Sequence, residues 1–472
     1  MTGRHLLSLS SLLWSASVLA QAPSPADTAA APGSPESFDL EAALISNDAR
    51  AFTSEEAGQK ARARSPQIAS SEAAADSARW DREGVWSGFM PTLTGQAAYI
   101  RYSEVNNRFE LPGGTPMGVN PDDFNFVLPP NSYQFSATAR YPVSDIFLRV
   151  WPQHSASKNI AQAREIEIET RRAQVDLTAR EAFYAHARAQ ATMLVADQAL
   201  KQAEAQAQQA KLFVDAGTAA PVDLMTATAR VESMRSALAR SRGAVAITRN
   251  TLATYAGLKN DQIVGIKERV TALPEVPKDD ADAFLARGLQ QRPELRAIRK
   301  LVEANGHTRV AERNGALPTL AVDGTVLYAN PNQRYIPIEE EFRTTWQVGA
   351  SLTWSANQAL IAHQRNQKFH AETNKALADL GALEDAVRIE VVQAYEDYKA
   401  ADAAARASEA QQRAAEETYR VRLATYRVGA GVQIDLLTSD LALTQARLDY
   451  VNAVIDARIA LARLARASGE PR

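Results

Sequence analysis

The chain has 472 residues, of which 46% are hydrophobic, a net charge of −3 and a pI near 6.2. This balance gives no reason to propose that the protein binds nucleic acid. The chain contains no cysteine, so neither disulfide bonds nor a thiol for lipid attachment are expected. The six histidines are scattered, and His363 and His370 are too widely spaced to share one metal ion without a third ligand. We therefore expect no metal, no other cofactor and no nucleic-acid partner.

Residues 1–20 predict a secretory signal peptide. Arg4 precedes an apolar run over residues 6–19, and small residues follow around the expected cleavage point after Ala20. A membrane anchor would need a longer apolar run. Residues 21–50 begin with a stretch rich in Ala, Pro and Ser, which predicts a flexible segment. The mature chain is therefore expected to be exported.

Two long stretches of the chain share the same landmarks at identical intervals. In each, a proline precedes a Pro-Thr-Leu element, and further along a glycine precedes an aspartate that a second glycine follows. The paired landmarks are Pro66, Pro91, Gly217, Asp223 and Gly257 in the first stretch, and Pro293, Pro318, Gly429, Asp435 and Gly469 in the second. This spacing predicts one architectural unit built twice. We place the repeats at residues 51–257 and 281–469, joined by a linker at 258–280 and followed by a short tail at 470–472.

Each Pro-Thr-Leu element is followed by two runs that alternate between apolar and polar residues. The four runs cover about 92–102, 133–143, 319–328 and 344–354. Each is about ten residues long, the length that a tilted strand needs to cross a bilayer core. Aromatic residues near the ends of the apolar faces are expected at the membrane interfaces, namely Tyr133, Tyr141, Trp346 and Trp354. A soluble hairpin alternates in the same way, but four such runs in an exported chain favour a transmembrane wall.

Four strands cannot close a barrel, and an open sheet in lipid would leave backbone groups without hydrogen bonds. Since about eight strands form the smallest common transmembrane barrel, several copies must share one barrel. A trimer would give twelve strands. The segments 103–130 and 330–342, which connect the paired strands, predict surface loops outside the cell.

Long helices account for most of the remaining chain. Residues 153–216 contain neither Gly nor Pro, and residues 355–428 contain only Gly381. Shorter partner helices are expected at about 222–256 and 434–468. In the last helix a 4-3 spacing predicts a coiled-coil seam through Leu437, Leu441, Thr444, Leu448, Val451 and Ile455.

The helix pairs are separated by glycine-containing breaks. Gly217 lies in the first break, which ends at Pro221, and Gly429 and Gly431 lie in the second. Glycine permits the turn, and proline is favoured in the first turn of the next helix. Both breaks lie at the ends of the long helices that are remote from the strands, so they should form one tip.

This doubled arrangement resembles the TolC-like outer-membrane efflux proteins over about residues 52–469. The resemblance is carried by Arg-Ser-Pro at 64–66, Arg-Pro-Glu-Leu at 292–295, both Pro-Thr-Leu elements, and tip motifs at 213–225 and 426–437. It implies a homotrimer in which a twelve-stranded outer-membrane barrel continues into a twelve-helix coiled-coil barrel in the periplasm. It also implies a passive exit duct that receives substrates from an inner-membrane pump and a periplasmic adaptor protein.

The resemblance also points to residues at the tip. In the family, acidic residues at the tapered entrance form rings that admit cations, and Asp435 matches one such ring. A second acidic position, one turn further on, is Thr438 here. In the family a Tyr and an Arg of the second copy also bind an Asp of the first and hold the tip closed. Tyr426 and Asp223 match two of these partners, but the Arg position is Gly431, so a weaker latch is expected.

Several alternatives stay open at this point. Asp223 and Asp435 also suit the simpler role of capping their helices. The duct could serve type I secretion of a polypeptide rather than efflux of small molecules, and a non-conducting structural coiled coil of the envelope is a further alternative. An enzyme is the least favoured class, because no catalytic triad, phosphate-binding loop or ligand cluster is evident.

Overall fold

The structure is a computed structural model that describes residues 40–45, 51–103, 129–258, 265–336 and 338–470. All of these residues belong to one compact unit, Leu40–Arg472. The predicted signal peptide, most of the segment 21–50 and most of the first predicted loop lie outside the described residues.

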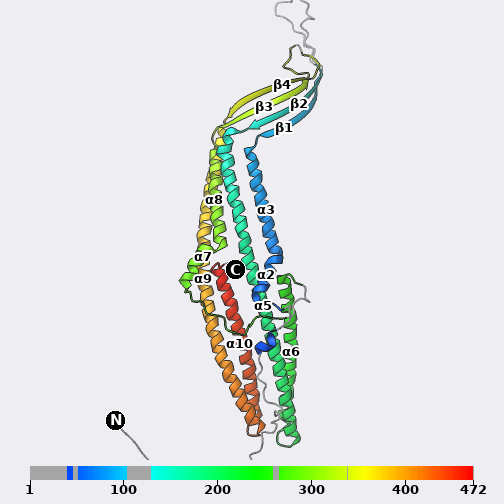
Figure 1. Cartoon of the computed structure of the whole chain (residues 1–472), viewed down its shortest axis with the longest axis vertical. Coiled ribbons are helices and arrows are strands. Elements are labelled where there is room, and N and C mark those ends of the chain that lie inside the picture. The colour runs from blue at the N-terminus through cyan, green and yellow to red at the C-terminus, as the bar shows by residue number, and fades with distance from the viewer. Residues whose placement is uncertain (1–39, 46–50, 104–128, 259–264, 337, 471–472) are drawn as a thin grey trace, which may run out of the picture. The chain divides into compact units, whose positions relative to one another are not determined.

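The element order is a helix, two strands and two long helices, twice over (Figure 1). The first set is α3 (Pro66–Trp86), β1 (Thr92–Arg101), β2 (Asn131–Tyr141), α5 (Trp151–Asp215) and α6 (Pro221–Ala256). The second set is α8 (Pro293–Asn314), β3 (Thr319–Asn330), β4 (Arg343–Thr353), α9 (Ala356–Arg427) and α10 (Gln433–Ala467). The shorter helical elements are α1 (Leu40–Leu44), α2 (Ser54–Arg64), η1 (Ser87–Phe89), α4 (Val143–Asp145), η3 (Ile146–Val150) and α7 (Ala281–Gln291).

The ends of the strands and long helices agree with the predicted ones to within two residues. The strand predicted for 133–143 ends earlier, at Tyr141. Pro142 follows it, and proline has no backbone N–H with which to continue the ladder. The chain then turns at once into helix.

The four strands form one antiparallel sheet in the order β1-β2-β3-β4. The register places Tyr99 opposite Tyr133 and Phe135 opposite Tyr328. One face of the sheet therefore collects the apolar residues predicted for all four strands, and these side chains are exposed. The opposite face is largely polar, and on it the hydroxyls of Thr138 and Thr325 lie 3.0 Å apart.

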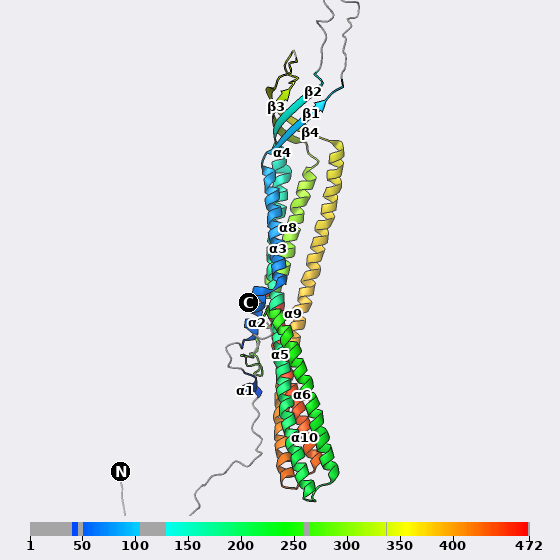
Figure 2. The ribbon, with the colours of Figure 1, turned by 90° about the vertical axis from the view of Figure 1, so that its right-hand side faces the viewer.

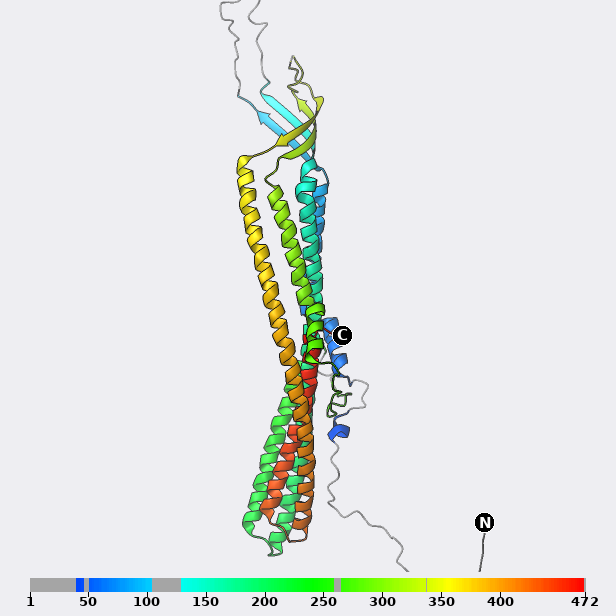
Figure 3. The same ribbon diagram turned by 90° about the vertical axis from the view of Figure 1, so that its left-hand side faces the viewer.

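The two longest helices, α5 and α9, contain 65 and 72 residues. At about 1.5 Å per residue they are about 97 and 108 Å long. Next to the sheet, α5 and α8 lie between α3 and α9; towards the other end, α6 and α10 take the places of α3 and α8 (Figures 2 and 3). Many of the buried helical residues are alanines, which permit close packing. No helix in the described part of the chain combines the length and apolarity needed to cross a membrane.

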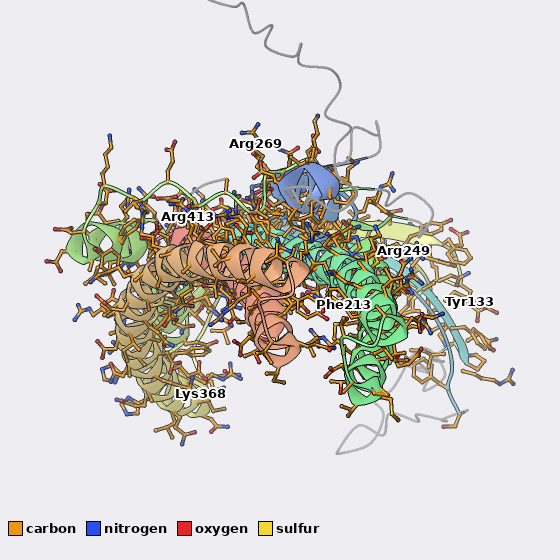
Figure 4. The ribbon with its side chains drawn as sticks, turned by 90° about the horizontal axis from the view of Figure 1, so that it is seen from below. Tyr133, Phe213, Arg249, Arg269, Lys368 and Arg413 are labelled. Atoms are coloured by element: carbon orange, nitrogen blue, oxygen red, sulfur yellow. The ribbon has the colours of Figure 1, made fainter. Side chains whose placement is uncertain are left out.

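The linker between the two sets of elements is held against the middle of the helices. The Glu268 carboxylate accepts hydrogen bonds from the Ser54 backbone N–H at 2.9 Å, the Tyr184 hydroxyl at 3.0 Å and the Arg458 guanidinium at 2.7 Å. Ile266 forms bridges with Phe52 and with the N-terminal segment. Seen from below, the helices form a curved layer, and the linker residue Arg269 lies on its outer side (Figure 4).

Candidate functional site at the helical tip

The two tip turns depend on glycine in the predicted way. Gly217 and Gly429 have φ values of 77° and 76°, in the left-handed region that favours glycine. Gly431 serves differently, because a Cβ atom there would lie only 2.9 Å from the backbone nitrogen of Tyr426. Its absent side chain allows the chain to pass close to the end of α9.

Asp223 caps the start of its own helix. One carboxylate oxygen accepts a hydrogen bond from the Ala220 backbone N–H at 3.2 Å. This N–H precedes the first turn of α6, where the helix itself supplies no acceptor. The capping role considered for Asp223 is therefore present.

Tyr426 is buried where the two helix pairs meet. Its ring packs edge-on against Phe213, with ring centroids 5.5 Å apart, and Figure 4 shows Phe213 on the side of the α5–α6 pair that turns towards α10. Burial raises the pKa of the Tyr426 hydroxyl, and the nearby Asp223 charge raises it further. Within the described residues, however, no hydrogen bond joins Tyr426 to Asp223. The expected latch bond is absent because the Asp223 carboxylate faces the Ala220 N–H.

A different hydrogen bond links the two helix pairs at the tip. The Gln433 side-chain amide donates to the backbone carbonyl of Asp223 at 2.9 Å. Gln433 is the first residue of α10, and Asp223 lies in the first turn of α6. The bond therefore joins the N-terminal ends of α6 and α10. The sequence does not predict this contact, since nothing in the local pattern distinguishes Gln433 from a solvated glutamine.

Asp435 lies in the first turn of α10 and makes an ion pair with Arg422 of α9, at 3.0 Å. The side chains are about half exposed, at 49% and 53%. No side chain caps α10, so the capping role considered for Asp435 is not seen. Thr438, at the position of the second acidic residue, donates its hydroxyl to the Ile434 carbonyl of its own helix. The candidate ring residue Asp435 therefore has its own counter-cation.

One turn further from the tip, a buried polar cluster joins all four helices. Asp440 of α10 is fully buried and pairs with Arg230 of α6 at 3.3 Å. Gln206 of α5 donates to the Tyr419 hydroxyl of α9 at 3.4 Å, and both side chains are buried beside this pair. Burial raises the pKa of Asp440, although the positive charges of Arg230 and then Arg447 act in the opposite direction.

The predicted coiled-coil seam is partly wrong here. Leu441 is 51% exposed, and Asp440 takes the core position between Leu436 and Leu443. Leu436, Asp440 and Leu443 also follow a 4-3 spacing, so the sequence did contain a signal for this row as the core-facing one. A carboxylate on the apolar row of a helix is unfavourable unless a partner meets it, and Arg230 could not be identified as that partner from the sequence.

The aromatic residues of the sheet lie at different heights along the strands. Tyr133 stacks near Tyr99 at the loop end, with ring centroids 5.0 Å apart, and Tyr141 ends β2 at the helix end. Trp354 follows β4, and its indole N–H donates to the Ala316 carbonyl at 3.1 Å. Trp346 lies further inside its strand, opposite Val326, and is 71% exposed.

Among the described residues, no group of three or more His, Asp or Glu side chains is arranged so that it could hold a metal ion. The recurring chemistry of the site is instead ion pairs, glycine turns and an apolar sheet face.

Comparison with known proteins identifies this architecture. A family model described as outer membrane efflux protein matches residues 57–258 and 285–470. No curated protein sequence matches the chain. Among solved structures, a Pseudomonas aeruginosa membrane protein is similar with a TM-score of 0.74 and 18% identity, covering 92% of this chain and 93% of that one. The Campylobacter jejuni CmeC outer membrane channel has a TM-score of 0.71 and 15% identity, covering 93% of each chain.

The outer membrane protein VceC from Vibrio cholerae is also similar, with a TM-score of 0.70 and 16% identity over 88% of this chain and 96% of that one. At these identities the structures show the shared fold, and the family model, which covers most of the chain, shows the family. The predicted resemblance is thereby confirmed. The chain belongs to the outer membrane efflux protein family, and it is an outer-membrane efflux channel with its helices in the periplasm.

Proposed function

We propose that the protein is the passive outer-membrane exit duct of a tripartite efflux system. It would work as a homotrimer and take substrates from an inner-membrane pump through a periplasmic adaptor. The observation that carries the proposal is a four-stranded sheet with an exposed apolar face, continuous with helices of about 100 Å.

The sheet supports the trimer because it has two unpaired edges. Among the residues that the structure describes, β1 pairs only with β2, and β4 pairs only with β3. In lipid these edges must find partners, since unpaired backbone groups are costly there. Pairing β4 of one copy with β1 of the next would close a twelve-stranded barrel after three copies. Leu93, Val348 and Leu352, which are 69–79% exposed in the single chain, would then face lipid.

The helices support the same head-to-tail contact. The α9 edge exposes Leu377 and Ile389, and the opposite α3–α6 edge exposes Trp80, Ile247 and Tyr255. Burying such apolar area against a neighbouring copy is favourable by about 25 cal/mol per Å². Because the two edges are different surfaces, the contact is heterologous and forms a ring when it closes. The internal duplication would make this ring quasi-sixfold.

The tip supports a docking role for the adaptor. Exposed apolar side chains surround both tip turns, namely Val222, Met225, Val428, Val432 and Ile434. Such a group on a water-facing end is typical of a protein contact site. An adaptor that covers these residues would reach the entrance of the duct directly.

At the entrance we propose a ring of three Asp435 carboxylates, each paired with Arg422. An exposed ion pair of this kind contributes only about 0–1 kcal/mol, so the pairs exchange readily with ions in solution. Gln433 and the packing of Tyr426 on Phe213 would hold the tip closed. These closing contacts involve only uncharged side chains, whereas Asp435 and Arg422 determine the charge at the entrance.

Single-channel conductance of the purified protein in planar bilayers tests the proposal. We expect a small conductance in the wild type. Asp435→Asn should lower the preference for cations and Arg422→Gln should raise it, because each change removes one sign of charge from the mouth. Asp449→Asn, an exposed carboxylate further along α10, is the matched control and should change little. A folded protein that never conducts would refute the duct and favour a structural coiled coil.

A further inference from the structure

A cavity of about 700 Å³ lies near the C-terminal end of α10, far along the helices from the tip (Figure 1). Its walls come from α2, α5, the turn between α7 and α8, and the end of α10. Five arginines and four carboxylates line it, namely Arg62, Arg172, Arg180, Arg296, Arg466, Glu169, Asp176, Glu294 and Glu470. The volume is within the range of small-molecule sites, and nine of the sixteen lining residues are charged.

Arg180 is the central feature of this cavity. The residue is only 9% exposed, and its Nε donates to the Asp176 carboxylate at 2.7 Å. Its two terminal nitrogens make no hydrogen bond with any residue that the structure describes. Other arginines of the cavity are occupied more fully at their ends, as Arg296 is by Glu169 at 2.9 Å. These donors open on the cavity that Arg180 lines, so a ligand with acceptor oxygens can reach them.

Asp176 holds this guanidinium in place. Asp176 is 6% exposed, and its other oxygen lies 3.5 Å from the Arg62 Nε. Gly58 of α2 makes room for it, since a Cβ atom there would stand 2.2 Å from that oxygen. The arginine is thus fixed by a buried carboxylate on one edge and presents its other edge to the cavity.

The buried Asp176–Arg180 pair of α5 has no counterpart in the other long helix, α9. When the two repeats are aligned at their glycine turns, Gly217 with Gly429, Arg388 and Val392 of α9 take the positions that Asp176 and Arg180 have in α5. Val392 is 46% exposed, and the Arg388 side chain is 56% exposed. The buried pair therefore belongs to the cavity rather than to the general pattern of the long helices.

We propose that this cavity binds a small, hydrophilic anion whose carboxylate or phosphate group lies on the terminal nitrogens of Arg180. The planar fork of a guanidinium matches both groups through two parallel hydrogen bonds. Within the described part of the chain, the ion-pair contacts of Glu294 and Glu470 are long, at 3.9 Å to Arg466 and 3.7 Å to Arg287. They are placed to accept a cationic or hydrogen-bonding part of the same ligand.

Isothermal titration calorimetry of the full-length protein in detergent at low salt tests this site, with N-acetylglutamate and inorganic phosphate as separate probes. We expect saturable binding of at least one probe. Binding of N-acetylglutamate alone would assign a carboxylate ligand such as an acidic peptide, and binding of phosphate alone would assign a phosphate-bearing one. No saturable binding of either probe would overturn the proposal.

Variants separate the site from nonspecific charge. Arg180→Gln should weaken binding at least tenfold, but it leaves the buried Asp176 with only its 3.5 Å contact to Arg62. The double variant Asp176→Asn/Arg180→Gln buries no charge and should show the same loss in a folded protein. Arg388→Gln, at the exposed position of α9 that corresponds to Asp176, is the control and should bind as the wild type does. Wild-type affinity in the double variant would refute the role of Arg180, and none of these results depends on channel conductance.

Discussion

Replacing Arg230 by methionine should destabilise the helical end of the protein more than any other single arginine substitution near the tip. Arg230 is the direct partner of Asp440, which is fully buried, at 3.3 Å. Removing one partner of a buried ion pair costs about 3–5 kcal/mol, because the other charge is left uncompensated. Arg447 also lowers the pKa of Asp440, so we expect the lower end of this range.

The loss of stability in Arg230→Met should depend on pH. Burial raises the folded-state pKa of Asp440 above its unfolded value, so the folded state binds the proton more readily. The stability from this group is present below the unfolded pKa and is lost as the pH rises through the folded pKa. Arg230→Met should raise the folded pKa further. The difference in unfolding free energy between the wild type and Arg230→Met should therefore become smaller as the pH is lowered.

Thermal unfolding followed by circular dichroism in detergent measures both effects. Arg230→Met should melt well below the wild type at neutral pH, and adding Asp440→Asn should restore most of the loss. Arg235→Met, which removes an exposed arginine paired with Glu232 on the same helix, is the control. The reasoning is wrong if Arg230→Met melts with the wild type, or if the double variant is as unstable as the single one.

Three further predictions use other parts of the molecule. Burial lowers the pKa of His186 to about 4, so the unfolded chain gains a proton before the folded protein does as the pH falls below about 6.5. In thermal melts the free energy of unfolding should therefore drop by up to about 3 kcal/mol over this pH range, and His186→Gln should remove that drop. Gly429→Ala, at positive φ, should lower stability by about 1 kcal/mol in the same melts. Val348→Arg, on the apolar sheet face at the middle of β4, should cost about 2–4 kcal/mol and prevent bilayer insertion, whereas Gln347→Arg on the other face should insert normally.

The sequence alone determined the elements and their order. Alternation with a period of two predicted the strands and the face on which Phe135 and Val348 lie, because neighbouring residues of a strand point to opposite sides. Long stretches without Gly or Pro predicted α5 and α9, and the turns at Gly217 and Gly429 follow from the left-handed backbone that glycine tolerates. These are local properties, set by residues close together in the chain.

Only the tertiary structure decided which side chains meet at the tip. It paired Asp435 with Arg422, Gln433 with the Asp223 carbonyl, and Asp440 with Arg230, a residue of the other repeat. It also placed Asp440 rather than Leu441 in the core. A helix has about 3.6 residues per turn, so a small rotation about its axis exchanges neighbouring residues between core and surface. That rotation is set by packing against the other three helices, which the pattern of one helix does not contain.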